Sequence, residues 1–304
     1  MRLERKTTTD SGSVFRRLFG ERGARSSSPR ESQVIAIASG KGGTGKSFLA
    51  TNLAVGLSAA GRAVTLVDGD FGLGNAHLLL GVNPRATLQH VIAGQASIEQ
   101  VRCATGFGPC LVPAGSGISR LAELSEREML ALVQALSRLA ATEDVLLLDT
   151  AAGISPQSLL TLLLADHVVL VTNPEIAAMT DAYALIKCLT RQPDPPPTSI
   201  VVNRVAVPGF GRATFQRLSD VARRFAGCDV HYLGEVPEDA AVTQRRLGQP
   251  PLLVSHPECP TAQCLYAILD QLSRRCGGLE PKPRAAGREL LQRLRSRLAL
   301  QPTG

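Results

Sequence analysis

Several common signals are missing from this chain of 304 residues. No apolar run approaches the roughly eighteen residues of a membrane-spanning helix, and the first thirty residues lack the apolar segment of a secretory signal. Its cysteines form no C-x-x-C pair, so neither a disulfide framework nor a zinc or iron–sulfur site is indicated. We therefore expect a cytoplasmic protein with reduced thiols. The seven scattered cysteines are Cys103, Cys110, Cys188, Cys228, Cys259, Cys264 and Cys276.

Charge separates the ends of the chain from its middle. Residues 1–31 contain eight Lys/Arg and four Asp/Glu, net +4, and residues 274–304 contain eight and two, net +6. The remaining seventeen basic and twenty acidic residues give residues 32–273 a net charge of −3. Basic ends on a slightly acidic middle indicate tails that meet an anionic surface, rather than a core that binds nucleic acid.

Between the basic ends, residues 32–275 alternate apolar runs with amphipathic segments and show no internal repeat. This alternation predicts the α/β class, with a single doubly wound, mostly parallel sheet and helices on both faces. We expect residues 1–31 to be a mostly disordered tail, 276–287 a linker, and 288–304 a basic amphipathic helix and tail. The predicted strands are 34–38, 63–67, 110–113, 144–148, 167–172, 198–203 and 230–235. The predicted helices are 46–60, 125–140, 156–164, 180–191, 212–226, 239–247 and 261–275.

A glycine-rich segment with two lysines follows the first predicted strand and precedes the first predicted helix. Strand, glycine-rich loop and helix in this order form a phosphate-binding P-loop, whose backbone N–H groups and helix N-terminus face the phosphates. Lys46 can reach the β- and γ-phosphates, and the Ser47 hydroxyl can bind Mg²⁺. The sequence therefore predicts a site for a nucleoside triphosphate with Mg²⁺. The loop residues are Gly40, Lys41, Gly42, Gly43, Thr44, Gly45, Lys46 and Ser47.

Acidic residues follow two of the predicted strands, at the edge where a parallel sheet binds its ligand. Asp149 is expected to hold the magnesium shell, and Asp68 is a second candidate ligand. Gly153 would let its backbone N–H approach the γ-phosphate. Many P-loop ATPases have a glutamate directly after the magnesium aspartate, whereas this chain has Thr150. We therefore assign the positioning of the attacking water to Asp70.

Lys41 lies early in the loop, where its side chain would point away from its own helix. The run from Lys41 to Ser47 resembles the deviant P-loop of the MinD/ParA class of ATPases. In that class the first lysine acts across an ATP-sandwiched dimer, so the resemblance implies that Lys41 reaches the phosphates of a second subunit. With no arginine finger evident, this implies hydrolysis that is slow in the monomer and faster in a dimer. The alternative is that Lys41 is merely a solvated lysine.

The base is expected to be adenine, because no Asn/Thr-Lys-x-Asp guanine motif follows a late strand. Asn203 and Arg204 follow one late strand, and Pro237 and Asp239 lie in a later loop. Both segments resemble the adenine-contacting segments of the MinD class. The alternative for Pro237 and Asp239 is that they start a helix. ATP and Mg²⁺ are therefore the expected ligands.

Four longer strings resemble the FlhG branch, also called FleN, of the MinD family, and the similarity spans residues 32–273. The resemblance implies a cytoplasmic ATPase that sets flagellar number and position and dimerises at the membrane. Its protein partner would be an FlhF-like GTPase or a flagellar transcription activator. The Asp-Gln-Ala-type activation motif of many FlhG proteins is not recognisable in residues 1–31. The four strings are 68–75, 113–117, 149–155 and 180–187.

A short amphipathic segment near the C-terminus is the expected membrane contact. On a helix, its leucines share a stripe roughly 100° wide, flanked by arginines that can reach lipid phosphates. MinD and FlhG proteins resemble this chain in carrying a C-terminal anchor, and the alternative is a helix docked on its own domain. Val14–Phe19 is a lesser candidate, with plain disorder as its alternative. The C-terminal residues concerned are Leu290, Leu291, Arg293, Leu294, Arg295, Arg297 and Leu298.

Other functions occur on the same fold. A MinD-type division-site ATPase has the same chemistry with a different partner. A ParA-type DNA-partitioning protein needs a basic patch on its folded domain, and the net charge of −3 argues against it. We therefore expect three partners: a second copy of the chain when ATP is bound, the anionic inner face of the cell membrane, and a flagellar protein. No sequence-specific nucleic acid is expected.

Overall fold

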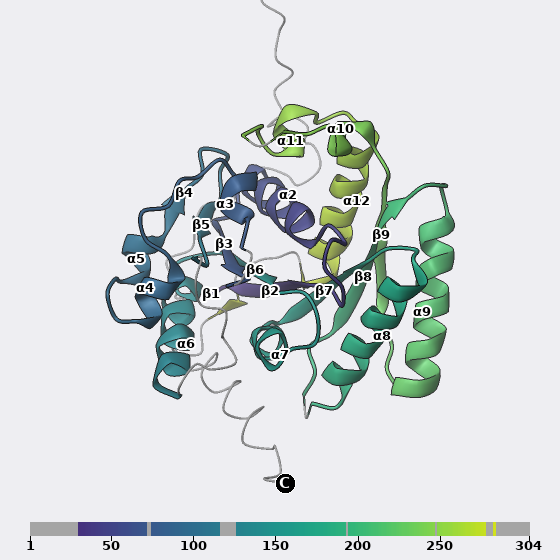
Figure 1. The fold of residues 1–304 in the computed structure, drawn as a ribbon, viewed down its shortest axis with the longest axis horizontal. Coiled ribbons are helices and arrows are strands. Elements are labelled where there is room, and N and C mark those ends of the chain that lie inside the picture. The colour runs from purple at the N-terminus through teal and green to yellow at the C-terminus, as the bar shows by residue number, and fades with distance from the viewer. Residues whose placement is uncertain are drawn as a thin grey trace, which may run out of the picture.

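Eight strands form one sheet at the centre of the molecule, and helices cover both of its faces (Figure 1). The structure, a computed structural model, describes residues 30–71, 74–115, 126–192, 194–246, 248–277 and 282–283. The strands are β1 (Arg30–Glu31), β2 (Gln33–Ala38), β3 (Val64–Gly69), β4 (Cys103–Ala104), β5 (Cys110–Val112), β6 (Val145–Thr150), β7 (His167–Thr172), β8 (Thr198–Val205), β9 (His231–Pro237) and β10 (Lys282–Pro283).

The described helices range from one turn to about five turns. They are α2 (Lys46–Ala59), α3 (Ala76–Leu79), α4 (Leu88–Ile92), α5 (Ile98–Val101), α6 (Glu126–Ala140), α7 (Pro156–Leu163), α8 (Ile176–Thr190), α9 (Phe210–Ala226), α10 (Ala240–Thr243), α11 (Leu252–Ser255) and α12 (Pro260–Arg275).

The order of the strands in the main sheet is β4-β5-β3-β6-β2-β7-β8-β9. All neighbours pair in parallel except β4 and β5, which are antiparallel. The chain first builds outward from β2 on one side and later on the other, so the order reverses at β2. In open α/β sheets the ligand binds at the carboxyl ends of the strands beside such a reversal, which here is the loop after β2. The predicted fold class is confirmed.

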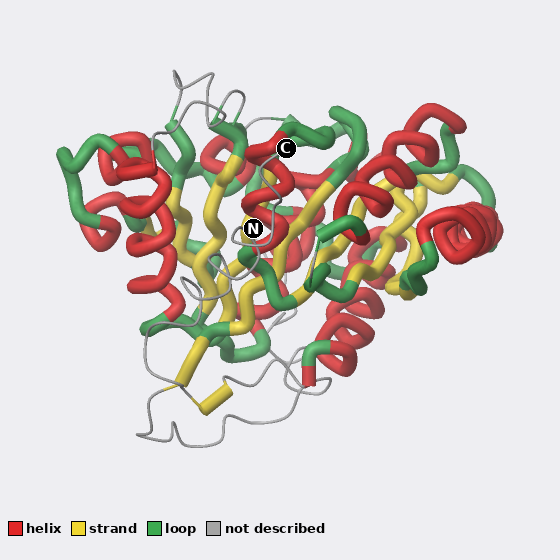
Figure 2. Tube along the Cα trace, turned by 90° about the horizontal axis from the view of Figure 1, so that it is seen from below, coloured by secondary structure: helices red, strands yellow, loops and turns green. Residues whose placement is uncertain are grey.

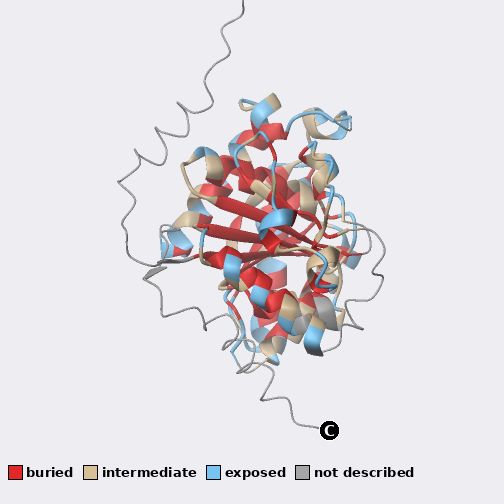
Figure 3. Ribbon diagram, turned by 90° about the vertical axis from the view of Figure 1, so that its left-hand side faces the viewer, coloured by how far each residue is buried: buried red, intermediate tan, exposed pale blue. Residues whose placement is uncertain are grey.

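Two hydrophobic cores lie on opposite faces of the sheet. In β2, Val34 and Ala36 face one core, while Ile35 and Ile37 face the other, as expected for the two-residue repeat of a strand. Helices α6, α7, α8 and α9 cover the first core, and α2, α11 and α12 cover the second (Figure 1). Figure 2 shows from another side how helices pack against the strands. Figure 3 shows the buried strands between these layers. Burial on both faces explains why the strands read as continuous apolar runs.

The helix predictions differ from the structure in three places. Helix α8 begins at Ile176, four residues before the predicted start, and the exposed Ile176 (84%) does not follow the core pattern. The helix predicted over 239–247 ends at Thr243, and beyond it the Arg245 guanidinium donates to the Gln249 and Pro250 carbonyl oxygens and to the Ser255 hydroxyl. The one-turn helices α3, α4, α5 and α11 were not predicted, since one turn is too short to show a helical repeat.

The ends of the described chain meet in a separate two-stranded sheet, in which β1 and β10 pair antiparallel. β10 lies within the segment predicted to be a linker. The predicted disordered tail, apart from Arg30 and Glu31, and the whole predicted C-terminal helix, residues 288–299, lie outside the described residues. Among the described helices, none is both long and apolar enough to cross a membrane.

Candidate nucleotide site

The glycine-rich loop joins β2 to α2 and is packed tightly between other segments. A Cβ on Gly40 would lie 2.3 Å from the backbone carbonyl carbon of Asp181 on α8. Gly45 has φ 92°, and a Cβ there would lie 2.1 Å from Nδ2 of Asn203. The same Asn203 amide donates a hydrogen bond of 2.7 Å to the carbonyl oxygen of Thr44. Neighbouring elements thus fix the loop, and glycine is required at both positions.

Lys46 and Asp149 form a buried ion pair behind the loop. The Lys46 Nζ lies 2.5 Å from Oδ1 of Asp149, and the two side chains are 7% and 1% exposed. The other carboxylate oxygen, Oδ2, is buried and has no hydrogen-bond partner. Burial raises the pKa of Asp149, and the Lys46 charge opposes this rise. An unpartnered buried oxygen beside a P-loop is a position where a cation or its bound water would compensate the lost hydration.

Asp68 lies beside Asp149 on the adjacent strand β3. Its two oxygens accept hydrogen bonds from the backbone N–H groups of Asp70 (3.1 Å) and Ala76 (3.2 Å). Burial, reinforced by the Asp149 charge, raises the pKa of Asp68 to about 7. Asp68 therefore holds the loop after β3 in place, and Asp70 is half-buried at the start of that loop.

The residues at this edge fit a magnesium ion. The Ser47 hydroxyl near Asp149 favours the charged carboxylate and so opposes the rise that burial causes in the pKa of Asp149. Hydroxyl and carboxylate oxygens are the ligand types that Mg²⁺ prefers, and the ion commonly keeps waters and phosphate oxygens as further ligands. In the described part of the chain, no three His, Cys, Asp or Glu side chains are grouped to bind a metal by themselves. A bound ion would thus depend on the phosphates of a nucleotide.

Lys41 is paired within its own subunit. Its Nζ lies 2.9 Å from Oε2 of Glu175, and the two side chains are 42% and 57% exposed. The hydrogen bond from Lys41 lowers the pKa of Glu175. Sequence reasoning did not identify Glu175, although an acid just after the strand at 167–172 could have drawn attention to it. The Lys41 ammonium remains open to solvent on the face that carries the loop.

Gly153 lies in the loop after β6, next to the start of the glycine-rich loop. It has φ 93°, and its N–H donates a hydrogen bond of 2.8 Å to the carbonyl oxygen of Ser39. A Cβ on Gly153 would lie 4.0 Å from the carbonyl oxygen of Gly40. Its N–H must leave Ser39 before it can donate to a phosphate.

A pocket of about 450 Å³ lies next to the loop and gathers the four predicted base-contacting residues. Asp239 begins α10, and its carboxylate accepts hydrogen bonds from the N–H groups of Ala241 and Thr261. Arg204 has a φ of 55°, which is uncommon outside glycine and occurs preferentially at functional sites. The pocket is lined by Gly45, Phe48, Asn203, Arg204, Val236, Pro237, Glu238, Asp239, Val242 and Thr243.

Comparison with known proteins gives consistent matches over most of the chain. A family model named ParA, described as NUBPL iron-transfer P-loop NTPase, matches residues 30–273. The antiactivator FleN of Pseudomonas aeruginosa is 36% identical over 240 residues, covering 79% of this chain and 86% of that protein. The flagellum site-determining protein YlxH of Helicobacter pylori is 37% identical over 212 residues, covering 69% of this chain and 71% of that protein.

A solved structure of similar fold is the septum site-determining protein MinD of Pyrococcus horikoshii, complexed with Mg-ADP. It is 28% identical, covers 82% of this chain and 98% of that chain, and superimposes with a TM-score of 0.66. The P-loop between β2 and α2, the strand order and these similarities all indicate the same family. The chain belongs to the ParA/MinD family of P-loop NTPases, and FleN and YlxH are among its relatives.

Proposed function

We propose that this protein is an ATPase switch that dimerises when it binds ATP, associates reversibly with the membrane and regulates flagellar number or placement. The observation that carries the proposal is the loop with two lysines, one buried against Asp149 and one exposed at the surface. The similarity to FleN and YlxH supports the flagellar role.

Each lysine has a separate task in the proposed reaction. Lys46 is buried beside the phosphate-binding loop and neutralises the β- and γ-phosphates. Lys41 leaves Glu175 and contacts the phosphates of the second subunit, where it stabilises the charge that develops in the transition state. Asp70 orients the attacking water, and Ser47 and Asp149 hold the metal shell. When bound, Mg²⁺ would neutralise phosphate charge and orient the phosphate oxygens.

Several exposed apolar side chains support a nucleotide-dependent dimer. Ile154 (48% exposed) follows Gly153, and Ile176 (84% exposed) follows Glu175. Val207 and Phe210 are exposed in the segment after Arg204. Apolar groups next to ligand-binding residues commonly mark a contact surface for another protein, and here the proposed occupant is a second copy of the chain.

The membrane contact is proposed from the sequence, because its residues lie outside the described part of the chain. Leu290, Leu291, Leu294 and Leu298 would enter the lipid, and Arg293, Arg295 and Arg297 would contact anionic headgroups. The protein would thus be cytoplasmic and peripherally bound to the inner face of the membrane. Its protein partner would be an FlhF-like GTPase or a flagellar transcription activator.

A division-site role of the MinD type is the second candidate. It is favoured by the shared fold of the MinD structure with Mg-ADP, whereas the higher identity to FleN and YlxH favours the flagellar role. The two are separated by phenotype. Loss of the gene should change the number or position of flagella in the flagellar case, and the placement of the septum in the division case.

The proposed switch is tested with purified protein and magnesium. ATP should convert the monomer to a dimer in size-exclusion chromatography with light scattering, and ADP should not. The specific hydrolysis rate should rise with protein concentration, because the dimer is the active form. A monomer in ATP with a concentration-independent rate would contradict the proposal.

A further inference from the structure

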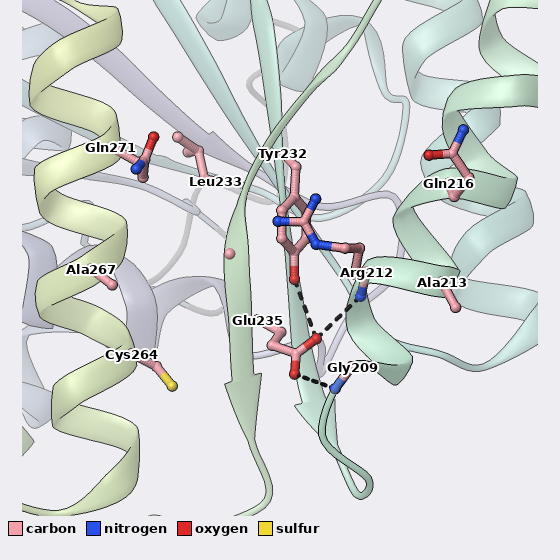
Figure 4. A pocket seen from close by; sticks show the side chains of 11 residues that line it. Gly209, Arg212, Ala213, Gln216, Tyr232, Leu233, Glu235, Cys264, Ala267 and Gln271 are labelled. Atoms are coloured by element: carbon pink, nitrogen blue, oxygen red, sulfur yellow. Dashed lines mark hydrogen bonds between the residues drawn. The ribbon is translucent and has the colours of Figure 1, made fainter.

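The carboxylate of Glu235 connects β9 to the start of α9, beside a groove between α9 and α12 (Figure 4). Its Oε1 accepts a hydrogen bond of 2.8 Å from the N–H of Gly209, and its Oε2 accepts one of 3.1 Å from the N–H of Arg212. The Tyr232 hydroxyl donates to the same Oε2 at 3.2 Å. One half-buried side chain therefore receives three hydrogen bonds.

Helix α9 lacks the usual N-terminal partners that Glu235 replaces. Its N-cap is Gly209, which has no side chain to accept a hydrogen bond, and its first turn contains no acid. Exposed N–H groups at a helix start favour a carboxylate, both as an acceptor and through the helix dipole. Burial and the Glu235 charge raise the pKa of Tyr232, so its hydroxyl stays protonated and continues to donate.

Packing restricts the Glu235 side chain further. A Cβ on Gly211 would lie 2.6 Å from the Glu235 Cβ and 2.5 Å from its Oε2, so no larger residue fits beside it. The Arg212 guanidinium lies 4.6 Å above the Tyr232 ring, and the Phe215 ring contacts the same tyrosine at 5.0 Å between centroids. The carboxylate thus has neighbours on each side that fix its position.

Glu235 also lies between the two segments that form the base pocket. Asn203 and Arg204 line that pocket, and residues 205–208 join them to Gly209, whose N–H donates to Glu235. On the other side, the pocket-lining residues Val236–Asp239 follow Glu235 immediately. β8 and β9 pair irregularly here, since the register shifts between Val202 and Val205. The ladder therefore pairs the two segments only at the ends of this irregularity, Val202 with Glu235 and Val205 with Pro237, and the base-pocket residues Asn203 and Arg204 lie between those pairs.

We propose that Glu235 is a positioning residue for nucleotide binding, which sets the spacing of the two base-pocket segments by binding the start of α9. The proposal rests on the proposed nucleotide-binding function. It predicts that loss of the carboxylate weakens binding of the adenine moiety much more than binding of the phosphates, because Glu235 itself contacts neither the P-loop nor Asp149 and is linked to the loop through the Asn203 bond to Thr44.

The test is Glu235→Gln in the full-length protein with Mg²⁺. Glutamine keeps the size but has one acceptor oxygen, so its NH₂ group faces either the Gly209 or the Arg212 N–H. Calorimetry should give an ATP affinity about fivefold to tenfold below that of the wild type. The affinity for inorganic tripolyphosphate, which has no base, should stay within about twofold, and the ATPase KM should rise while kcat stays constant.

Two further variants separate this role from general damage to the fold. Tyr232→Phe removes one hydrogen bond but keeps both bonds to α9, so its ATP affinity should match the wild type. Asp220→Asn, on the exposed side of α9, is the matched charge control and should also match it. Equal losses for ATP and tripolyphosphate in Glu235→Gln, or no loss of ATP affinity, would overturn the proposal. A wild type that binds no ATP would instead overturn the proposed function.

Discussion

Lys46 and Asp149 are both buried, so each depends on the other for its charge. Removing one partner of a buried pair costs about 3–5 kcal/mol when the remaining charge cannot escape. If Lys46 is removed, Asp149 can become protonated and lose its unpaired charge, because burial already raises its pKa. The pair therefore matters more for ligand binding than for stability.

Lys46→Ala should abolish tight ATP binding. The variant loses the only lysine buried beside the described P-loop, and a charge-assisted contact to phosphate is replaced by water. The expected loss of affinity is about hundredfold or more by calorimetry. Circular dichroism should confirm that the variant is folded. Wild-type affinity would refute the assignment of the loop.

Asp70→Ala should bind ATP but hydrolyse it about a hundredfold more slowly, because the variant lacks the group proposed to hold the attacking water. The prediction follows from Thr150, which stands where many P-loop ATPases have a glutamate. With hydrolysis blocked, the ATP-bound dimer should persist in size-exclusion chromatography. A normal turnover rate would mean that another residue holds the water.

Lys41→Ala should bind nucleotide as a monomer and fail to form the ATP dimer. Its side chain contacts Glu175 at the surface and takes no part in the buried Lys46 pair, so ATP affinity should change little. Hydrolysis should fall about 10³-fold, the lower end of the effect of losing a transition-state cation. Light scattering that shows a normal dimer in ATP would remove the cross-subunit role.

The strands and longer helices could be predicted because their patterns are local. The runs 145–148 in β6 and 168–171 in β7 are apolar throughout, as expected for strands buried on both faces. Short elements were not predicted, because a single helical turn shows no repeat and β4 has only two residues. The P-loop and Asp149 were found as motifs, whereas Glu175 and Glu235 act through contacts that form only when distant strands and helices meet. Such tertiary contacts do not correspond to any regular spacing of residues in the sequence, so a motif search does not find them.

The buried histidine of β7 should make stability depend on pH. His167 is 4% exposed and lies 2.9 Å from the Ser199 hydroxyl on β8. Burial, aided by Arg275, lowers its pKa from 6.5 to about 4. Between these values the unfolded chain binds more protons, so the free energy of unfolding falls as pH decreases. The His167 contribution is complete above pH 6.5, and about 2 kcal/mol of it is lost between pH 7 and pH 5.

The comparison is with His167→Gln, whose amide can keep the contact with Ser199 but does not titrate. Urea unfolding at pH 7 and pH 5 should show the wild type losing more stability than the variant over this range. The comparison with the variant is needed because Asp68 has a raised pKa. Asp68 therefore makes the free energy of unfolding rise as pH decreases over the same pH range. Parallel pH profiles for the two proteins would contradict a buried neutral His167.

Across the whole molecule, the middle of the chain and its ends differ in charge and in their proposed roles. The candidate nucleotide site lies at the carboxyl ends of the strands of the sheet. Residues 32–273, which contain this sheet and its helices, have a net charge of −3. The net positive charge lies in residues 1–31 and 274–304, and these two segments pair with each other through β1 and β10. Residues 1–29 and 284–304 therefore join the described chain at neighbouring points, which would suit joint contact with an anionic surface.

Deleting residues 288–304 should release the protein from anionic membranes and leave its ATP binding intact. The deletion starts beyond β10, so the described fold and the nucleotide site keep all their residues. In the full-length protein the leucine stripe is expected to supply apolar burial, and Arg293, Arg295 and Arg297 are expected to add about 1 kcal/mol each near an anionic surface. One short helix binds weakly, so binding should require the dimer, in which two anchors act together.

Co-sedimentation with phosphatidylglycerol and phosphatidylcholine vesicles measures this dependence directly. The full-length protein should pellet with the anionic vesicles in ATP and much less in ADP, because only the dimer presents two helices. A full-length variant with Leu294→Ser and Leu298→Ser should behave like the deletion, since it keeps the arginines and loses the apolar stripe. If the truncated protein pelleted as well as the full chain, the C-terminal anchor would be wrong. Membrane contact would then have to be sought in Val14–Phe19, the other basic and apolar segment of the chain.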